Sequence, residues 1–298
     1  MNWFYLALLA PAIFTIVNYI DKYVIVSKVR DYRGMPVYGA ITAIVFGTIF
    51  WLFSGTPILS LRDALLVISA GFISLIAYYL YFNALSKNET SFVIILFQVQ
   101  PVFVLILSFL FLKETITAQQ FIGFSLIISS AIGLSLKKDL EKIRLSSSLY
   151  TILAVDFLLA ISNILIKFTI DANSFSKILS YESWGLALGG LVLYLFFEHV
   201  RKAFRESFRS VGKKVLGIMF LNEGIFIIGK AVNFLAISLG SVALVSVLGS
   251  TMTFYGILYG IILTMLAPKI FKENLTKEAI SKKILFSLIL LLGIYLLS

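Results

Sequence analysis

Apolar residues occupy ten long runs of this chain, and polar residues are concentrated in the short stretches between the runs. A helix needs about 20 predominantly apolar residues to cross roughly 30 Å of hydrocarbon. The pattern therefore predicts an all-α integral membrane protein whose connections are too short to hold a soluble domain. The ten predicted transmembrane helices are at about 3–26, 36–54, 62–86, 91–112, 117–136, 148–170, 181–199, 214–238, 240–267 and 280–298.

The composition supports this fold class. Hydrophobic residues make up 60% of the chain and charged residues 13%, and the mean hydropathy is +1.00. Soluble proteins carry about 25% charged residues, and disordered chains have low hydrophobicity. The chain has no cysteine and one histidine, His199, which argues against a thiolate or histidine metal site and leaves few catalytic groups. We predict no enzymatic activity, no cofactor and no bound metal.

The basic residues predict the orientation in the bilayer. The chain has 25 Lys and Arg against 15 Asp and Glu, a formal net charge of +10. Of the 25, 19 lie in or beside the odd-numbered connections and three lie in the even-numbered ones. Because cytoplasmic loops are enriched in Lys and Arg, we predict cytoplasmic odd-numbered loops and extracytoplasmic termini in the cell membrane. The basic residues are dispersed over short loops, so we predict no nucleic-acid partner.

The chain resembles a duplication of five segments. A charged run at 137–147 separates residues 1–140 from residues 148–298, and short matches recur in the same order in both parts. Because five is an odd number, the two copies must enter the bilayer from opposite sides, an arrangement that is typical of secondary transporters. The matches are Asn18 and Lys22 with Asn163 and Lys167, Ala84-Leu85-Ser86 with Ala236-Ile237-Ser238, and Leu112-Lys113-Glu114-Thr115-Ile116-Thr117 with Phe271-Lys272-Glu273-Asn274-Leu275-Thr276.

Several of these residues resemble the hallmark repeat of the EamA-type family in the drug/metabolite transporter superfamily. The residues that carry the resemblance are Tyr81-Phe82-Asn83-Ala84-Leu85, Pro101, Leu112-Lys113-Glu114, Gly123 and Gly133, with Glu273 and Gly293 kept in the second copy and Thr253 in the place of Pro101. The resemblance implies ten helices as two inverted five-helix repeats around a central cavity, lined mainly by helices one, three, four, six, eight and nine. Family members export amino acids and other metabolites, or move nucleotide sugars, sugar phosphates and small cations.

Charged residues inside a bilayer are costly, so each one suggests a function. Asp156, Asn163 and Lys167 share one face of the sixth segment, because their spacings are seven and four residues. Glu223, Lys230 and Asn233 form a similar stripe on the eighth segment, so we expect the two stripes to face one another across the cavity. In the alternative interpretation, Glu223 pairs with Lys230, or Asp156 with Lys167, and the pairs only specify helix packing.

Other polar residues are weaker candidates for the cavity. Lys22, with Asp21 beside it, is as compatible with a position at the membrane interface as with the cavity. Glu182 and Glu198 lie near the ends of the seventh predicted segment, where no cavity is needed to explain them. The Ser and Thr residues of the ninth segment are more typical of close helix packing. The further predicted substrate-binding residues are Asn18, Tyr78, Tyr81, Gln98, Gln100 and Ser250.

Together these observations predict a secondary transporter that moves a small polar metabolite by alternating access. An amino acid or related zwitterion is the preferred substrate, because the charges within the helices balance, and export is the preferred direction. Asn163, Lys167, Lys230 and Asn233 are predicted to bind this substrate, and Glu223 and Asp156 to couple its transport to protons. The alternatives are a lipid or polyprenyl-carrier flippase and a non-transporting membrane partner. A monomer and a homodimer are both compatible with the sequence.

Overall fold

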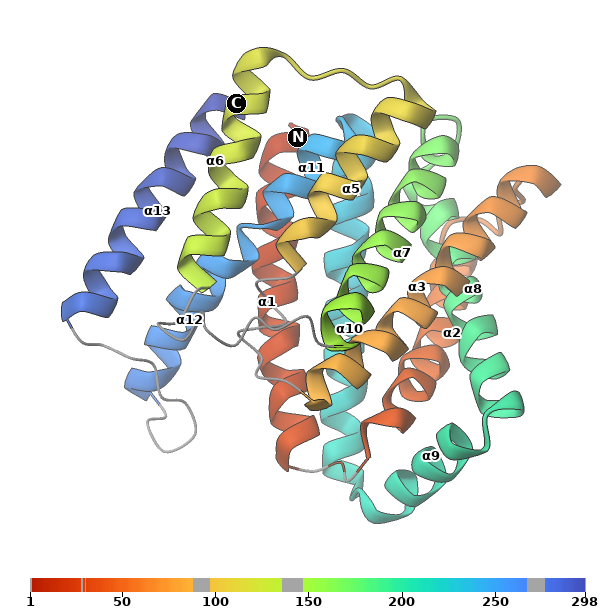
Figure 1. Ribbon diagram of the computed structural model, residues 1–298. Helices are drawn as coiled ribbons and strands as arrows, with labels where there is room; N and C mark the ends of the chain where they lie inside the picture. The colour runs from red at the N-terminus through yellow and green to blue at the C-terminus, as the bar shows by residue number, and fades with distance from the viewer. Residues whose placement is uncertain are drawn as a thin grey trace.

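The computed structural model describes residues 2–27, 29, 31–87, 97–135, 147–266 and 277–297, and every regular element in these ranges is a helix. The long helices run side by side as a bundle (Figure 1). The elements are α1 (Trp3–Ser27), η1 (Tyr32–Gly34), α2 (Met35–Phe53), α3 (Leu61–Lys87), η2 (Phe97–Val99), α5 (Gln100–Leu107), η3 (Ser108–Leu112), α6 (Ala118–Ser135), α7 (Ser147–Ile170), α8 (Phe175–Phe196), α9 (Glu198–Ser210), α10 (Lys213–Leu239), α11 (Val242–Gly249), α12 (Met252–Leu266) and α13 (Lys277–Leu297).

The described helices have the length and surface of a multi-pass membrane protein. Seven segments are long and apolar enough to cross a bilayer, and two shorter apolar segments lie at Phe97–Leu112 and Ala118–Gly133. Large hydrophobic side chains are exposed along the outside of the bundle, among them Leu65, Phe109 and Leu288. Such a surface would be an aggregation liability in water and matches a lipid environment. The prediction of an all-α membrane protein is therefore confirmed.

Most predicted segments agree with the observed helices within a few residues, but the seventh does not. The prediction was 181–199, whereas α8 spans Phe175–Phe196. Polar residues of its first turns, such as Ser176 and Lys177, lower the local hydropathy, so the hydropathy pattern placed the beginning of the helix too late. Phe197 is extended, with φ −112° and ψ 101°, and ends α8 before a new helix begins.

The new helix, α9, was missed because it does not contain an apolar run. It buries Val200, Ala203 and Ser207 and exposes Lys202 and Arg205. This amphipathic pattern is typical of a helix that lies along a surface. In Figure 1, α9 crosses the end of the bundle that is opposite to the two chain termini.

Two of the predicted helices are broken in the structure. The fourth consists of η2, α5 and the π-helical turn η3, and its predicted residues 91–96 lie outside the described residues. Pro101 lies in the first turn of α5, where its missing N–H costs no hydrogen bond. The prediction of one continuous helix at 240–267 was wrong, because α11 ends at Gly249 and α12 begins at Met252. At this break the amides of Ser250 and Thr251 donate hydrogen bonds to the carbonyls three residues earlier, in place of α-helical hydrogen bonds. The hydroxyl of Thr251 also donates to the Leu248 carbonyl.

The buried core lies where helices from the two parts of the chain meet. Helix α2 packs against α8, α3 against both α7 and α8, α1 against α10, and α6 against α13. Helices α3 and α8 approach so closely that only glycine fits at two positions. A Cβ atom on Gly71 would collide with the backbone of Glu182, and one on Gly185 with the backbone of Ile68.

Candidate functional site

An ion pair between Lys230 of α10 and Glu182 of α8 lies at the centre of the candidate site. The side chains are only 7% and 1% exposed, and Lys230 Nζ also donates a hydrogen bond to Glu182 Oε2. The ammonium lies 5.6 Å from the ring centroids of Phe226 and Phe234. Burial of two charges is costly, and removal of either partner would leave the other charge uncompensated. This pair therefore links α8 firmly to α10.

This pairing differs from both pairings that the sequence suggested. Lys230 pairs with Glu182, which we expected near the end of a span, and not with Glu223. Because α8 begins at Phe175, Glu182 lies two turns inside the helix. Had the beginning of α8 been placed correctly, the sequence would have shown Glu182 as a charged residue inside a span.

Glu223 lies seven residues before Lys230, about 10 Å nearer to the beginning of α10. Its half-buried carboxylate forms no hydrogen bond or ion pair within the described part of the chain. It lies close enough to Asp21 and Lys230 to interact electrostatically with both. The adjacent Asn222 donates a 2.8 Å hydrogen bond from Nδ2 to Asp21 Oδ1, and its buried Oδ1 has no partner among the described residues. Glu223 is therefore a carboxyl group inside the bundle that has no partner of its own in the described part of the chain.

The two predicted tyrosines flank this group of charges. The Tyr78 ring packs edge-on against Phe226 at 5.9 Å, and Tyr78 interacts electrostatically with Glu182 and Glu223. The Tyr81 ring packs against Phe97 at 5.2 Å, and Tyr81 interacts electrostatically with Asp21. We call Asp21, Tyr78, Glu182, Glu223 and Lys230 the central charge cluster. It joins α1, α3, α8 and α10 and contains three carboxyl groups and one ammonium.

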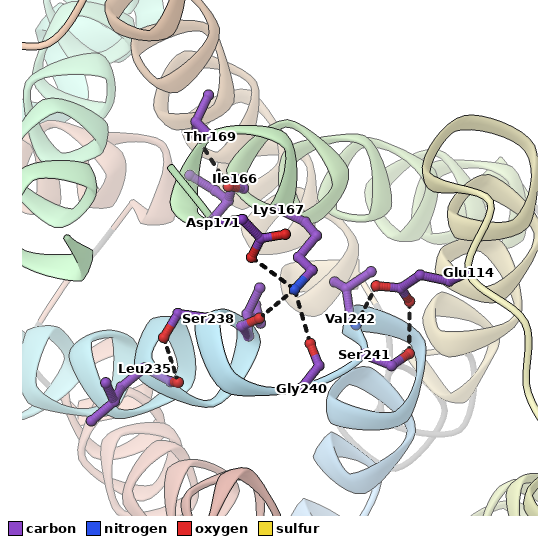
Figure 2. A network of polar contacts seen from close by, with 11 residues as sticks. Glu114, Ile166, Lys167, Thr169, Asp171, Leu235, Ser238, Gly240, Ser241 and Val242 are labelled. Carbon is purple, nitrogen blue, oxygen red and sulfur yellow. Dashed lines mark hydrogen bonds and ion pairs between the residues drawn. The ribbon is translucent and has the colours of Figure 1, made fainter. Parts of the chain in front are cut away.

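The polar stripe of α7 divides into three different environments. Asp156 is fully buried, and neither of its carboxylate oxygens has a hydrogen-bond partner among the described residues. Asn163 is half-buried, as is Asn233 on α10. Lys167 does not pair with Asp156, because its ammonium binds Asp171 Oδ1 at 3.0 Å, the Ile237 carbonyl at 3.0 Å and the Gly240 carbonyl at 3.1 Å. Lys167 therefore joins the end of α7 to the end of α10 (Figure 2).

Glu114 holds the neighbouring end of α11. Its Oε2 accepts a 2.6 Å hydrogen bond from Ser241 Oγ, and its Oε1 accepts a 3.3 Å bond from the Val242 amide. Figure 2 shows Glu114 and Lys167 on either side of the short link between α10 and α11. A carboxylate at a helix N-terminus binds unsatisfied amides and is favoured by the helix dipole. We call Glu114, Lys167, Asp171 and Ser241 the end clasp.

The two broken helices meet near α1. Gln98 Nε2 donates a 3.2 Å hydrogen bond to Thr253 Oγ1, which connects the beginning of the fourth helix to the beginning of α12. On α1, Asn18 Nδ2 contacts Met252 Sδ at 3.2 Å, and the Tyr19 hydroxyl donates a 2.6 Å bond to the Gly256 carbonyl. Ser250 is buried, and its hydroxyl has no partner among the described residues. The structure thus brings the predicted residues Asn18, Gln98 and Ser250 to the same helix break.

The remaining predictions near the site are only partly described. Gln100 is half-buried at the beginning of α5. The side chain of Lys22, the repeat segment around Glu273 and the charged run at 137–142 lie outside the described residues. Within the described ranges, no group of three or more His, Cys, Asp or Glu side chains has an arrangement that could hold a metal ion.

A separate pocket of about 360 Å³ lies between η1 and α9, and its lining residues are Asp31, Ala203, Glu206, Ser207, Arg209 and Ser210. The carboxylate of Asp31 accepts hydrogen bonds from Arg33, the shortest at 2.6 Å. This bonding to Arg33 lowers the pKa of Asp31 below its ordinary value. Asp31 therefore remains ionised and already has a partner, whereas Glu206 and Arg209 have none among the residues that the structure describes.

Comparison with known proteins finds a family match for the first part of the chain. Residues 1–136 match the model of the EamA-like transporter family, a domain of the drug/metabolite transporter superfamily. For these residues, the resemblance predicted from the motifs is therefore confirmed. One crystal structure matches with a TM-score of 0.68 and 13% sequence identity, over 99% of this chain and 94% of the other. At this identity the match concerns the fold alone. No curated protein matches the sequence.

Proposed function

We propose that this membrane protein, whose residues 1–136 belong to the EamA-like transporter family, is a secondary transporter that exports a small polar metabolite. The central charge cluster is the observation that carries the proposal. Asp21, Glu182, Glu223 and Lys230 come from three helices that are candidate spans, and they lie close together. Charged groups inside a bilayer are rare and mark the pathways of substrates and ions.

An amino acid or a related zwitterion is the proposed substrate. The cluster holds both signs of charge, as this substrate requires. The ammonium group of the substrate would bind near Glu223, which has no partner of its own among the described residues. The carboxylate of the substrate would bind to Lys230 once Glu182 moves away. Asn18, Gln98 and Ser250 at the helix break offer further polar contacts, because discontinuous helices often form substrate sites in transporters. Tyr78 and Tyr81 would enclose the substrate from α3.

Two inverted five-helix repeats, residues 1–140 and 148–298, are the proposed architecture. A two-fold axis in the membrane plane exchanges the repeats, so each contact between helices of different repeats needs a counterpart. The contact of α1 with α10 corresponds to that of α3 with α7, and α1 with α11 corresponds to α5 with α7. The pairs α2 with α8 and α6 with α13 correspond to themselves. This reciprocal pattern supports ten spans in an inverted arrangement.

Alternating access would follow from rocking of these repeats around the cluster. The end clasp supports the proposal that the end of the bundle near the chain termini is closed in this conformation. Glu114 and Lys167 restrain the α10–α11 link from two sides, so opening of this end requires that their hydrogen bonds break (Figure 2). The breaks at Pro101 and at Ser250 supply points where helices four and nine can bend.

Glu223 and Asp156 are the proposed coupling residues. A buried carboxylate without a hydrogen-bond donor is strongly disfavoured, so a proton or another cation would accompany Asp156 in this conformation. Glu223 lies beside the site that the substrate ammonium would use, so proton and substrate would compete for the same carboxylate. Such competition links export of the substrate to entry of a proton.

The proposed location is the cell membrane, with odd-numbered loops in the cytoplasm and both termini outside. Figure 1 shows the two termini at the same end of the bundle, as an even number of spans requires. The opposite end carries α9, whose exposed basic residues include Lys202, Arg205 and Arg209. This distribution agrees with the bias of cytoplasmic loops toward Lys and Arg.

Transport by purified protein in proteoliposomes tests the proposal. Counterflow is measured with a panel of radiolabelled amino acids, with and without an imposed pH gradient. We expect accumulation of at least one amino acid above the level of empty liposomes, and little accumulation by Lys230→Met protein that remains folded. The proposed function would be overturned if folded wild-type protein accumulated no member of the panel.

A further inference from the structure

Helix α9 is held at the boundary of the bilayer by the chain itself. Helix α8 ends at Phe196 and α10 begins at Lys213, and both are candidate membrane spans. Both ends of α9 therefore lie within a few residues of the hydrocarbon. An amphipathic helix in this position lies among the lipid headgroups. Phe197 and Phe208, 43% and 54% exposed, are apolar side chains of the kind by which interfacial helices enter the boundary between headgroups and acyl chains.

The pocket between η1 and α9 contains two unpaired charges of opposite sign. Glu206 and Arg209 both line it, both are exposed, and neither forms an ion pair or hydrogen bond in the part of the chain that the structure describes. The hydroxyl of Ser210 donates to the Ser207 carbonyl at 3.1 Å, so its oxygen is left to accept a hydrogen bond from a ligand. Asp31 is neutralised by Arg33. The pocket thus offers one cation and two acceptors.

We propose that this pocket binds the headgroup of phosphatidylethanolamine from the adjoining leaflet. Arg209 would bind the phosphate, and Glu206 would accept hydrogen bonds from the primary ammonium with help from Ser210. A guanidinium matches phosphate oxygens in geometry and in charge. The assignment to a lipid follows from the position of the pocket, since the candidate spans α8 and α10 hold both ends of α9 close to the headgroup region.

Charge and hydrogen bonding exclude the other common headgroups as preferred ligands. A phosphatidylglycerol headgroup could place its phosphate on Arg209, but it has no ammonium to neutralise Glu206. A phosphatidylcholine headgroup has the same formal charges as phosphatidylethanolamine, but its trimethylammonium has no N–H to donate. The pocket should therefore prefer phosphatidylethanolamine over both.

Native mass spectrometry of the delipidated protein tests this preference. The protein is mixed with phosphatidylethanolamine, phosphatidylcholine and phosphatidylglycerol that have identical acyl chains, each at the same concentration. We expect phosphatidylethanolamine to be retained about fivefold over phosphatidylcholine, as roughly one additional charge-assisted hydrogen bond at an exposed site would give. Glu206→Gln should abolish this preference, and Arg209→Gln should reduce retention of both zwitterionic lipids.

Lys202→Gln is the matched control, because Lys202 is exposed on the same helix, pairs with Glu198 and does not line the pocket. Its lipid preference should equal that of the wild type. Equal retention of phosphatidylethanolamine and phosphatidylcholine would overturn the proposal, as would an unchanged preference in folded Glu206→Gln protein. Displacement of the lipid by micromolar phosphoethanolamine would overturn the assignment to a lipid, since it would indicate a site for a soluble metabolite.

Discussion

Glu182 of α8 and Lys230 of α10 form an ion pair that is almost completely buried, with side chains 1% and 7% exposed. Figure 1 shows their helices as parts of one bundle, although 48 residues separate the two side chains. The pair brings a carboxylate and an ammonium to the point where α3, α8 and α10 meet. Its breaking and re-forming are the central step of the proposed mechanism, and several experiments can measure its role.

Removal of one partner should destabilise the protein more than removal of both. We expect Glu182→Gln and Lys230→Met each to lower the free energy of unfolding by about 3–5 kcal/mol, because each leaves a buried charge unpaired. The double variant should recover most of this loss. Thermal unfolding followed by size-exclusion chromatography in detergent measures the effect. Glu223→Gln is the control, since no ion pair is lost. A double variant as unstable as the single variants would contradict this account.

Glu223 should be required for proton-driven transport and not for folding. We expect Glu223→Gln protein to elute as the wild type does and to lose accumulation driven by a pH gradient, while substrate exchange persists. Asp156→Asn should have the same direction of effect. Proteoliposome flux at several external pH values gives the measurement. Glu198→Gln, at an exposed carboxylate on α9, is the control. Full proton-driven accumulation by Glu223→Gln would remove Glu223 from the coupling mechanism.

The end clasp should open during transport. The chain has no cysteine, so a disulfide in the variant Glu114→Cys with Ser241→Cys can form only between these two positions. We expect oxidation to reduce flux by roughly tenfold or more and a reductant to restore it, because the crosslink holds the link between α10 and α11. The two single cysteine variants, treated in the same way, are the controls. Undiminished flux through fully crosslinked protein would show that this end does not open.

The contact between α3 and α8 should tolerate no side chain at its glycines. We expect Gly185→Ala to cost about 1–3 kcal/mol of stability, because its methyl group would overlap the backbone of Ile68. Gly217→Ala on α10 is the matched control, since a Cβ there would meet no atom within 4 Å. The control should be neutral or stabilising by up to about 1 kcal/mol, because alanine favours a helix over glycine. Unfolding midpoints compare the two variants, and equal effects would contradict the close packing.

Reporters fused to the chain should distinguish the two ends of the bundle. A reporter that is active only in the cytoplasm should be active when inserted after Ser210 and inactive after Ser298, because the termini and α9 lie at opposite ends (Figure 1). Activity at both positions would contradict the three spans, formed by α10, by α11 with α12, and by α13, that separate α9 from the C-terminus. Activity only at Ser298 would reverse the orientation and leave the fold unchanged.

Hydropathy was sufficient to locate most helices, because burial in lipid imposes long apolar runs whatever the neighbours are. It failed at α9, because this amphipathic helix has no apolar run and packs its buried face on the protein. It also failed at the break between α11 and α12. There the backbone hydrogen bonds of Ser250 and Thr251 depart from the α-helical pattern, although the surrounding sequence is apolar. Lys230 and Glu223 were recognised as unusual from their position in a span alone.

The sequence by itself determined that this protein crosses the membrane with apolar helices, resembles a transporter family in its motifs, and carries charges inside the bilayer. It did so because the cost of exposing polar groups to lipid acts on each segment separately. Only the tertiary structure decided that Lys230 pairs with Glu182, that Lys167 and Glu114 hold the α10–α11 link, and that α9 forms a pocket with η1. These relationships depend on which helix faces lie against each other, and that is set by packing between segments far apart in the chain, including the close approach of α3 and α8 at Gly71 and Gly185.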